Sequence, residues 1–403
     1  MRRRAVFLLS PLLALLVCEG AVRYYQGAVP APSDSSYLPD AAAGYRLRPS
    51  PPGADPASND HVNALGFRDR EHPLRRPPGT RRILGVGDSF VYGAVPPRLN
   101  FLRVAQTELA RTLPADAPPV EMILMGCPGW NTDSQAGIVA ALGPALEPDL
   151  VVLCFSVDTD VTGIPVRGRV LQGNLLYTGA QEPLLNGLRK SRLFVLAEQV
   201  ALRRVTAAAR RFGRALTGRR PAAAAPGDID GAASPDPSLP PPTRHYLARQ
   251  VRLLPLFAPT PDARTAALWR EAERQLDRFA AACRTANAPW VLLVIPAEIQ
   301  VDAALRRVVS ERAGRPWADL DFDLPQRRLA AWAGARDVPL VDPLAALRVA
   351  GAQVRLYVPN NSHWNARGNA VAGRLLAAAL ASRLAGEPDP APSSLSPPRT
   401  GSR

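Results

Sequence analysis

The chain has almost no lysine and few cysteines or histidines, and each shortage argues against a class of function. Its 403 residues carry a formal net charge of +14. Lys190 is nevertheless the only lysine, and the arginines that supply the charge are spread along the chain. No zinc finger, basic zipper or RNA-binding signature accompanies them. We therefore expect solvated arginine faces and no nucleic-acid partner.

Cysteine is too sparse for a zinc site or a disulfide-rich scaffold. The four cysteines are Cys18, Cys127, Cys154 and Cys283, whose spacing fits neither arrangement. The four histidines include no pair at helical spacing. The sequence also lacks a Walker loop and a G-x-G-x-x-G turn after a strand. Any chemistry is therefore expected to need no metal and no other cofactor.

The N-terminus has the pattern of an export signal. Arginines at 2–4 precede an apolar run over 5–18, which is short for a spanning helix unless 20–22 extend it. No clean cleavage site follows, which favours an uncleaved signal-anchor over residues 1–22 with its arginines in the cytoplasm. The prediction is a single-pass protein of the cell inner membrane or periplasm, with the rest of the chain outside the cytoplasm.

Proline numbers 43 residues and gathers in a few segments. These segments predict an irregular linker at 23–58, a disordered Pro/Ala-rich insertion at 218–244 and a disordered tail at 386–403. With 47% of the chain hydrophobic, the span 59–385 can bury a sizeable core. We expect it to form one domain that contains the insertion.

Apolar runs alternate with amphipathic patterns across this domain. The runs that predict buried strands cover 82–86, 120–125, 150–155, 290–295 and 339–341. The patterns that predict helices cover 98–113, 132–142, 188–216, 264–286, 301–312, 324–335 and 366–384. Such alternation is typical of a parallel sheet covered on both faces. The predicted fold is three-layer α/β/α with a mostly parallel five-stranded sheet.

Four polar segments follow strands of this predicted sheet. The first strand ends in Gly87-Asp88-Ser89, the second in "MGCPGWNTDSQ" (125–135) and the third in "CFSVDTD" (154–160), while "YVPNNSHWNARGN" (357–369) follows the last. Ligands bind beyond the carboxyl ends of parallel strands, so these segments should converge. Acyl transfer requires such parts, namely a hydroxyl, a histidine base and donors for an oxyanion.

The order of these motifs resembles the SGNH/GDSL hydrolase superfamily, and "GDSFVYG" with "SHWNARGNAVAGRLL" is its most specific combination. The resemblance covers roughly 59–385. The segments "NALGFRDRE", "WVLLVIPAEIQVDA" and "PLVDPLAALR" are similar to an exported, membrane-anchored bacterial branch that includes alginate O-acetyltransferase-like proteins. The resemblance to this superfamily implies an SGNH/flavodoxin-like fold, Ser89 as nucleophile and His363 as base. It also implies that the N–H groups of Ser89 and Gly129 bind the oxyanion, with Gly126 a less favoured choice than Gly129.

Two positions depart from the pattern of this superfamily. Where the family has an asparagine that donates to the oxyanion, we place Thr159; a shifted register would instead turn the Asp158 carboxylate toward the oxyanion and repel it. Where the family has an aspartate before the histidine, this chain has Asn360 and Asn361. Either asparagine can orient His363 without supplying a compensating charge.

Two further carboxylates are interpreted as structural. Asp88 is expected to accept from backbone donors in its turn, and Asp342 to cap or close a turn rather than orient the histidine.

The predicted function is that of a serine esterase or acyl hydrolase working through an acyl-serine intermediate. Its substrate is expected to be an acylated small molecule, lipid or polysaccharide, an expectation that follows from the predicted location and the resemblance. Two alternatives stay open. One is an O-acetyltransferase of a cell-surface polysaccharide, and the other is a catalytically inactive envelope scaffold.

Overall fold

The computed structural model describes residues 14–22, 24, 36–163, 166–171, 174–179, 193 and 241–384. By its internal contacts the chain divides into two units, Met1–Tyr37 with Pro165–Gly231 and Leu38–Ile164 with Ala232–Arg403. Several predictions fall outside the described residues. These are the start of the signal-anchor, the helix at 188–216 apart from residue 193, most of the insertion and the tail at 386–403.

The first unit contains a β-hairpin. Strands β6 (Val166–Leu171) and β7 (Asn174–Gly179) pair antiparallel. Residues 14–22 are helical. Over the described ranges, no helix combines the length and the apolar character that crossing a bilayer requires.

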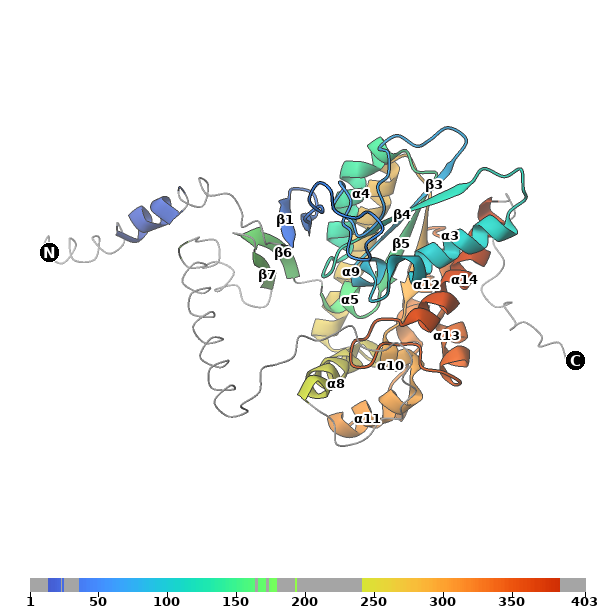
Figure 1. The fold of residues 1–403 in the computed structure, drawn as a ribbon. Helices are drawn as coiled ribbons and strands as arrows, with labels where there is room; N and C mark the ends of the chain where they lie inside the picture. The colour runs from blue at the N-terminus through green and yellow to red at the C-terminus, as the bar shows by residue number, and fades with distance from the viewer. Residues whose placement is uncertain are drawn as a thin grey trace, which may run out of the picture. The chain divides into compact units, whose positions relative to one another are not determined.

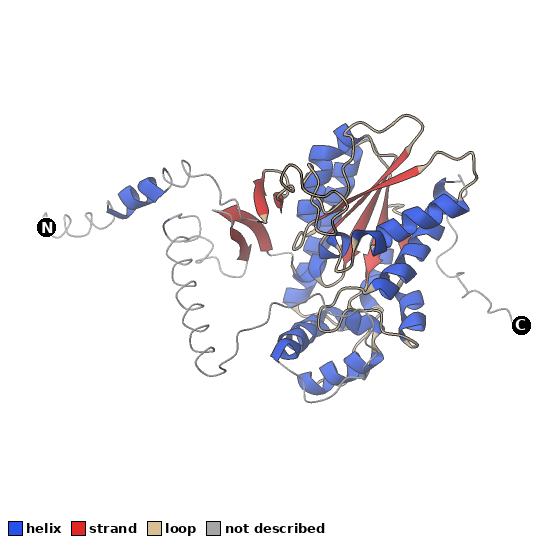
Figure 2. Cartoon of the chain, viewed as in Figure 1, coloured by secondary structure: helices blue, strands red, loops and turns tan. Residues whose placement is uncertain are grey.

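The second unit is built on a five-stranded parallel sheet (Figure 2). Its strands are β3 (Arg81–Gly87), β4 (Val120–Gly126), β5 (Leu150–Ser156), β8 (Trp290–Ile295) and β9 (Leu340–Val341). They lie in the order β4-β3-β5-β8-β9, and each neighbouring pair is parallel. The predicted α/β class and five-stranded sheet are therefore confirmed.

Helices cover both faces of this sheet (Figure 1). On one face lie α3 (Phe101–Thr112) and α14 (Ala366–Leu384), which pack on each other; on the other lie α4 (Thr132–Leu146) and α9 (Ala263–Thr285), which also pack together. The strands are buried nearly throughout because each has a helical layer on both sides. Gly85 shows how tightly α3 lies on the sheet, since a Cβ there would come within 2.3 Å of Leu102 Cδ1.

Further helices gather near the carboxyl ends of the strands (Figure 1). They are α8 (Pro241–Leu253), α10 (Glu298–Val301), α11 (Ala303–Ala313) and α13 (Leu344–Gly351). The remaining elements of this unit are α2 (Ser89–Tyr92), η1 (Pro97–Leu99), α5 (Thr159–Thr162), η2 (Leu254–Phe257), η3 (Trp317–Asp319) and α12 (Leu324–Gly334). The patterns that predict helices do not include α8 or α13. Helix α8 also begins inside the last four residues of the predicted disordered insertion.

The predicted irregular linker contains a β-ribbon. Strands β1 (Tyr37–Asp40) and β2 (Gly44–Leu47) pair, and the Asp40 carboxylate accepts from two backbone N–H groups in the turn between them. Tyr45 then links the ribbon to the turn after β4. Its hydroxyl donates to Pro128 O at 2.8 Å, and its carbonyl accepts from Trp130 Nε1 at 2.9 Å. The ribbon therefore holds the turn that contains Gly129.

Candidate active site

The strand order itself predicts where a ligand would bind. From β3 the chain moves to one neighbour, β4, and then returns to the other side of β3 as β5. In open α/β sheets, a crevice forms beyond the carboxyl ends of the strands at this switch point. Ser89 follows β3 and Thr159 follows β5. Both residues therefore lie at the edge of the sheet where the crevice is expected.

The turn that carries Ser89 is fixed from below by Asp88. The Asp88 carboxylate accepts from Phe90 N at 2.8 Å, and its carbonyl accepts from Tyr92 N at 3.1 Å. This confirms the interpretation of Asp88 as a cap for backbone donors. Gly126 permits the turn to sit directly on β4, because a Cβ there would come within 2.4 Å of Tyr92 N. Ser89 remains partly exposed at the top of the turn.

His363 lies directly beside Ser89. The imidazole Nε2 and Ser89 Oγ are 2.7 Å apart, although 274 positions separate the two residues in the sequence. On the other side of the ring, Nδ1 is 2.9 Å from Asn361 O and 2.5 Å from Asn361 Oδ1. Because both of these atoms are acceptors, Nδ1 must carry the proton. Nε2 is then free to accept the hydrogen bond that the Ser89 hydroxyl donates.

Of the two candidate asparagines, Asn361 is the one that contacts the imidazole. Asn360 is exposed and has a left-handed backbone with φ +57°. Within the described chain it makes no hydrogen bond to the ring. Asp342 does not orient His363 either, because its carboxylate accepts from Leu344 N at 3.0 Å. The reading of Asp342 as a cap is therefore confirmed.

Aromatic packing anchors the segment that carries His363. Phe90 stacks near the imidazole with ring centroids 4.8 Å apart, and it also meets Trp364 edge-on at 5.1 Å. Trp364 is fully buried and packs against Phe101 at the start of α3. Asn369 joins the same two elements, since it accepts from Phe101 N and donates to Trp364 O. The base and the nucleophile are therefore held by one shared core.

The environment of His363 keeps its imidazole neutral. Burial lowers the pKa of His363 to about 4; the Asn361 carbonyl partly offsets this effect, and the positive charge of Arg249 adds to it. A neutral imidazole is the form that accepts a proton from a hydroxyl. The low pKa also makes it a weak base, because efficient general bases have pKa values near the working pH.

The turn after β5 differs from the pattern expected of an oxyanion donor. The Asp158 carboxylate forms an ion pair with Arg249 of α8 at 2.6 Å, so its charge is compensated. The Thr159 hydroxyl lowers the pKa of the nearby Asp88 carboxyl, although Asp88 Oδ2 has no hydrogen-bond partner among the described residues.

Two buried carboxyls lie beneath the serine turn. Burial raises the pKa of Asp88 to about 6, although the N–H of Phe90 and the hydroxyl of Thr159 counteract this effect. Burial also raises the pKa of Asp160, and the nearby Asp88 raises it further. Asp160 is bound by Thr132, Gln135 and the N–H of Ser156. Asp88 Oδ2 has no hydrogen-bond partner among the described residues.

Gly129 lies in the turn that follows β4, next to the serine turn. Gly126 pairs with Gly87 in the parallel ladder, which places both turns at the same edge of the sheet. Gly129 has φ +81°, a conformation that favours glycine. In the part of the chain that the structure describes, the N–H groups of Ser89 and Gly129 donate to no acceptor. Both are therefore available as donors to a ligand.

Several residues at this edge were not predicted from the sequence. Arg249 and Gln250 come from α8, and Gln250 binds Ser362 beside the histidine. Asn369 lies inside the motif that carries His363, but its link to α3 was not predicted. No local pattern could have identified the two α8 residues, because an arginine and a glutamine on an amphipathic helix usually belong to a solvated face.

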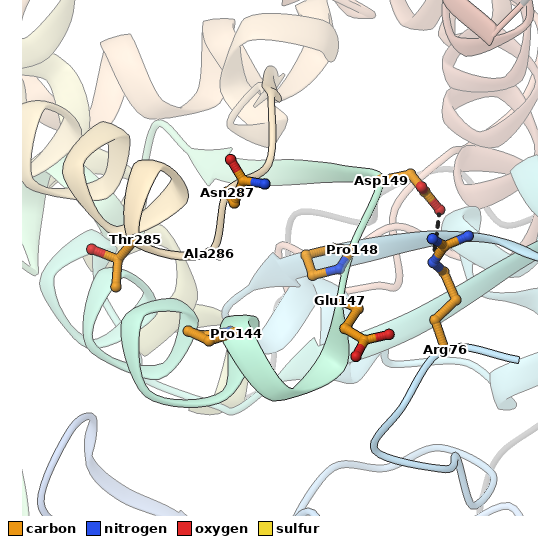
Figure 3. A pocket seen from close by; sticks show the side chains of 8 residues that line it. All are labelled: Arg76, Pro144, Glu147, Pro148, Asp149, Thr285, Ala286 and Asn287. Atoms are coloured by element: carbon orange, nitrogen blue, oxygen red, sulfur yellow. Dashed lines mark ion pairs between the residues drawn. The ribbon is translucent and has the colours of Figure 1, made fainter.

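A separate hollow lies at the opposite, amino-terminal edge of the sheet. Its volume is about 490 Å³, and the residues that line it are Arg76, Pro144, Glu147, Pro148, Asp149, Thr285, Ala286 and Asn287 (Figure 3). An ion pair at 3.5 Å joins Arg76 and Asp149 on one side of it (Figure 3). It contains none of the residues around Ser89. Within the described ranges no group of histidine, cysteine or carboxylate side chains is arranged to hold a metal ion.

Comparisons with known proteins show distant structural likenesses. The chain matches no family model and no curated protein. Among solved structures it is similar to a lipase/acylhydrolase from Enterococcus faecalis (13% identity, 75% of this chain and 97% of that chain, TM-score 0.37). It is also similar to the acetyl xylan esterase AlAXEase (13% identity, 74% of this chain and 99% of that chain, TM-score 0.37). A third similar structure is a member of the lipolytic protein G-D-S-L family from Veillonella parvula (10% identity, 73% of this chain and 96% of that chain, TM-score 0.33). At these identities and TM-scores the likenesses assign no function to this chain.

Proposed function

We propose that this chain is a serine esterase or acyl hydrolase of the SGNH type. The observation that supports this proposal best is the hydrogen-bonded series of Ser89, His363 and Asn361, in which Nε2 lies 2.7 Å from Ser89 Oγ. A hydroxyl beside a neutral imidazole whose other nitrogen is held by an acceptor is the arrangement that activates a serine nucleophile.

The proposed reaction follows from this geometry. Ser89 Oγ attacks the acyl carbon of an ester while its proton passes to His363 Nε2. The N–H groups of Ser89 and Gly129 stabilise the oxyanion that forms. The intermediate then expels the alcohol, which takes the proton from His363, and leaves an acyl-Ser89. A water molecule, deprotonated by the same imidazole, attacks the acyl-serine. The bond between Ser89 Oγ and the acyl carbon then breaks, Oγ takes the proton from His363 Nε2, and the carboxylic acid leaves.

The amide of Asn361 makes this a slow variant of the mechanism. An aspartate in its position would offset the positive charge of the imidazolium that forms during the reaction, whereas an amide only orients the ring. In a serine protease triad the change from aspartate to asparagine costs about 10⁴ in rate, a loss that includes the wrong tautomer of the histidine. Because Asn361 keeps the proton on Nδ1 here, about 10⁴ is an upper bound for this chain. We therefore expect measurable but slow ester hydrolysis.

The substrate and location remain those inferred from the sequence. We propose an acylated small molecule, lipid or polysaccharide, processed outside the cytoplasmic membrane by a domain anchored through residues 1–22. The basic, then apolar, N-terminal pattern supports the location. Transfer of the acyl group to a sugar hydroxyl would use the same acyl-serine with a different acceptor.

A fluorophosphonate probe tests the proposal directly, because it phosphonylates an activated serine. We expect labelling of the wild-type chain at Ser89, no labelling of Ser89→Ala and a rate at least about 10²-fold lower for His363→Ala. Ser310→Ala is a matched control, since Ser310 is a buried serine on α11. It should label like wild type.

The outcome that would refute the proposal is a folded wild-type chain that stays unlabelled across the pH range in which it remains folded. That result would favour the inactive scaffold. If labelling occurs, release of p-nitrophenol from its acetate ester, with and without an added glycan acceptor, distinguishes hydrolysis from transfer.

A further inference from the structure

Helix α8 makes polar contacts with three separate loops at the edge that carries Ser89. Tyr246 donates a short hydrogen bond to the buried carboxyl of Glu298, which follows β8. Arg249 pairs with Asp158, which follows β5. Gln250 donates to Ser362, next to the histidine. Glu298 begins α10, Asp158 precedes α5, and Ser362 lies between α13 and α14, so one helix connects three separate segments, two of which belong to the proposed site.

The contact of Gln250 with Ser362 bears most directly on the histidine. Gln250 Nε2 lies 3.0 Å from Ser362 Oγ, across 112 positions of sequence, and both side chains are buried. Ser362 has φ +60°, a left-handed conformation that an L-residue adopts only when its surroundings impose it. Asn360, two residues earlier, has φ +57°. The turn just before His363 is therefore strained at two positions.

The position of Gln250 is energetically unfavourable for a glutamine. It is fully buried, and its Oε1 has no partner in the described part of the chain. A buried amide with one unsatisfied acceptor costs free energy that an apolar side chain of similar size would not. Packing alone would therefore favour leucine at this position. Among the described residues, the one hydrogen bond of the amide is to Ser362, the residue beside His363.

We propose, on the basis of the function proposed above, that Gln250 is a positioning residue for His363. By holding the Ser362 hydroxyl, it keeps the strained turn 360–362 in the conformation that points the imidazole at Ser89. The contacts of Tyr246 and Arg249 fix α8 against the same edge and so fix the position of Gln250 itself. Gln250 does not touch the reacting atoms and acts only through Ser362.

Four variants test this role. Gln250→Leu and Ser362→Ala each remove the bond from one side, and the double variant removes both partners. Gln275→Leu is the matched control, since Gln275 is a buried glutamine on α9 whose Oε1 is likewise unpartnered within the described residues. Thermal unfolding of all four full-length chains shows which variants fold.

The first measurement is the rate of fluorophosphonate labelling. We expect Gln250→Leu and Ser362→Ala each to label about 10- to 10²-fold more slowly than wild type, the range expected when a reacting group moves by about 1 Å. The double variant should be no slower than the slower single variant, because both changes break one bond. Gln275→Leu should label at the wild-type rate.

The second measurement does not depend on activity. The pKa of His363 is followed by NMR of chains with labelled histidine. Among the described residues, the charged side chain that acts on the pKa of His363 is Arg249 on α8, which lowers it. Gln250→Leu leaves that charge in place. We expect the pKa of His363 to rise from about 4 toward its ordinary value, because a relaxed turn exposes the ring to water.

Two results would overturn the inference. One is a folded Gln250→Leu chain with wild-type labelling and an unchanged pKa of His363. The other is a double variant whose loss equals the product of the two single losses, which would show that Gln250 does not act through Ser362. If wild type itself does not label, the proposed function fails, and the pKa of His363 still decides whether Gln250 holds the turn.

Discussion

At the scale of single residues, Asn361 sets the character of the proposed site. Its side chain fixes the tautomer of His363 through Nδ1 but supplies no negative charge. The imidazole is therefore oriented like the base of a triad, while burial keeps its pKa at about 4. The series Ser89–His363–Asn361 is uncharged over a wide pH range. Its reactivity should respond to pH only when the imidazole is protonated.

Asn361→Asp tests this account. A carboxylate beside Nδ1 favours the imidazolium, so the pKa of His363 should rise above its wild-type value of about 4. Since the base acts when it is neutral, wild-type labelling should stay constant as pH falls and decline only near pH 4. The variant should begin to decline at a higher pH but label faster near pH 7, by up to about 10⁴-fold.

The labelling rate as a function of pH is the measurement, with Asn360→Asp as the matched control because Asn360 does not contact the ring. An acid limb at the same pH in wild type and Asn361→Asp would contradict the account.

Residues that belong to a short local motif could be predicted from the sequence. Residues whose role depends on contacts made in the folded structure could not. Ser89 and His363 each sit in a recognisable short pattern. The choice between Asn360 and Asn361 stayed open because it depends on the backbone conformation of one turn. Thr159 was chosen by position alone, and its effect on the pKa of Asp88 depends on the burial of that carboxyl, which no pattern reveals.

At the scale of elements, the serine turn depends on its contact with the end of β4. Gly126 has Tyr92 N and the backbone of Val91 so close that no side chain fits. We expect Gly126→Ala to push α2 away from β4. The variant should unfold at a lower temperature and label more slowly, because Ser89 would shift relative to His363.

Gly334→Ala provides the control, since a Cβ at Gly334 meets nothing within 4 Å. Because Gly334 is the last residue of α12, alanine there should stabilise the chain by less than the gain of about 0.5–1 kcal/mol expected in a helix interior and leave labelling unchanged. Wild-type labelling and stability in Gly126→Ala would show that the contact is not required.

The elements that could be predicted well from the sequence are those whose apolar side chains are buried. The strand predicted at 290–295 matches β8, and the helix predicted at 366–384 matches α14. Helix α8 was missed because it opens with two prolines at the end of a Pro/Ala-rich segment, which resembles a disordered region. The ribbon β1–β2 was missed because each strand has only four residues.

At the scale of the whole molecule, a buried ionic cluster lies away from the proposed site. His72 Nδ1 is 2.7 Å from Glu121, and its Nε2 is 3.0 Å from Asp69. Arg82, whose side chain is fully buried, pairs with Glu121 at 2.8 Å and donates to the carbonyls of residues 74 and 146. The cluster fastens the segment before β3 to the sheet and to the end of α4.

Arg82→Met tests whether a loss of folding stability at this cluster leaves the labelling rate of Ser89 unchanged. Removing one partner leaves Glu121 buried with a less compensated charge, which costs about 3–5 kcal/mol in comparable buried pairs. Chemical denaturation should show this loss, whereas the fraction that remains folded should label at the wild-type rate. Arg111→Met, an exposed pair with Glu108, should change stability by less than about 1 kcal/mol. If the folded fraction of Arg82→Met labels more slowly than wild type, the cluster also influences the geometry of the site.

The separation of Ser89 and His363 by 274 positions also has a kinetic consequence. Neither residue has a reactive neighbour until the strands between them have assembled and α14 has docked on α3. Contacts between such distant parts of a chain form late, because closing a long loop is entropically costly. A collapsed but unfinished chain would thus be chemically inert, and the ability to attack an ester would mark the moment at which folding is complete.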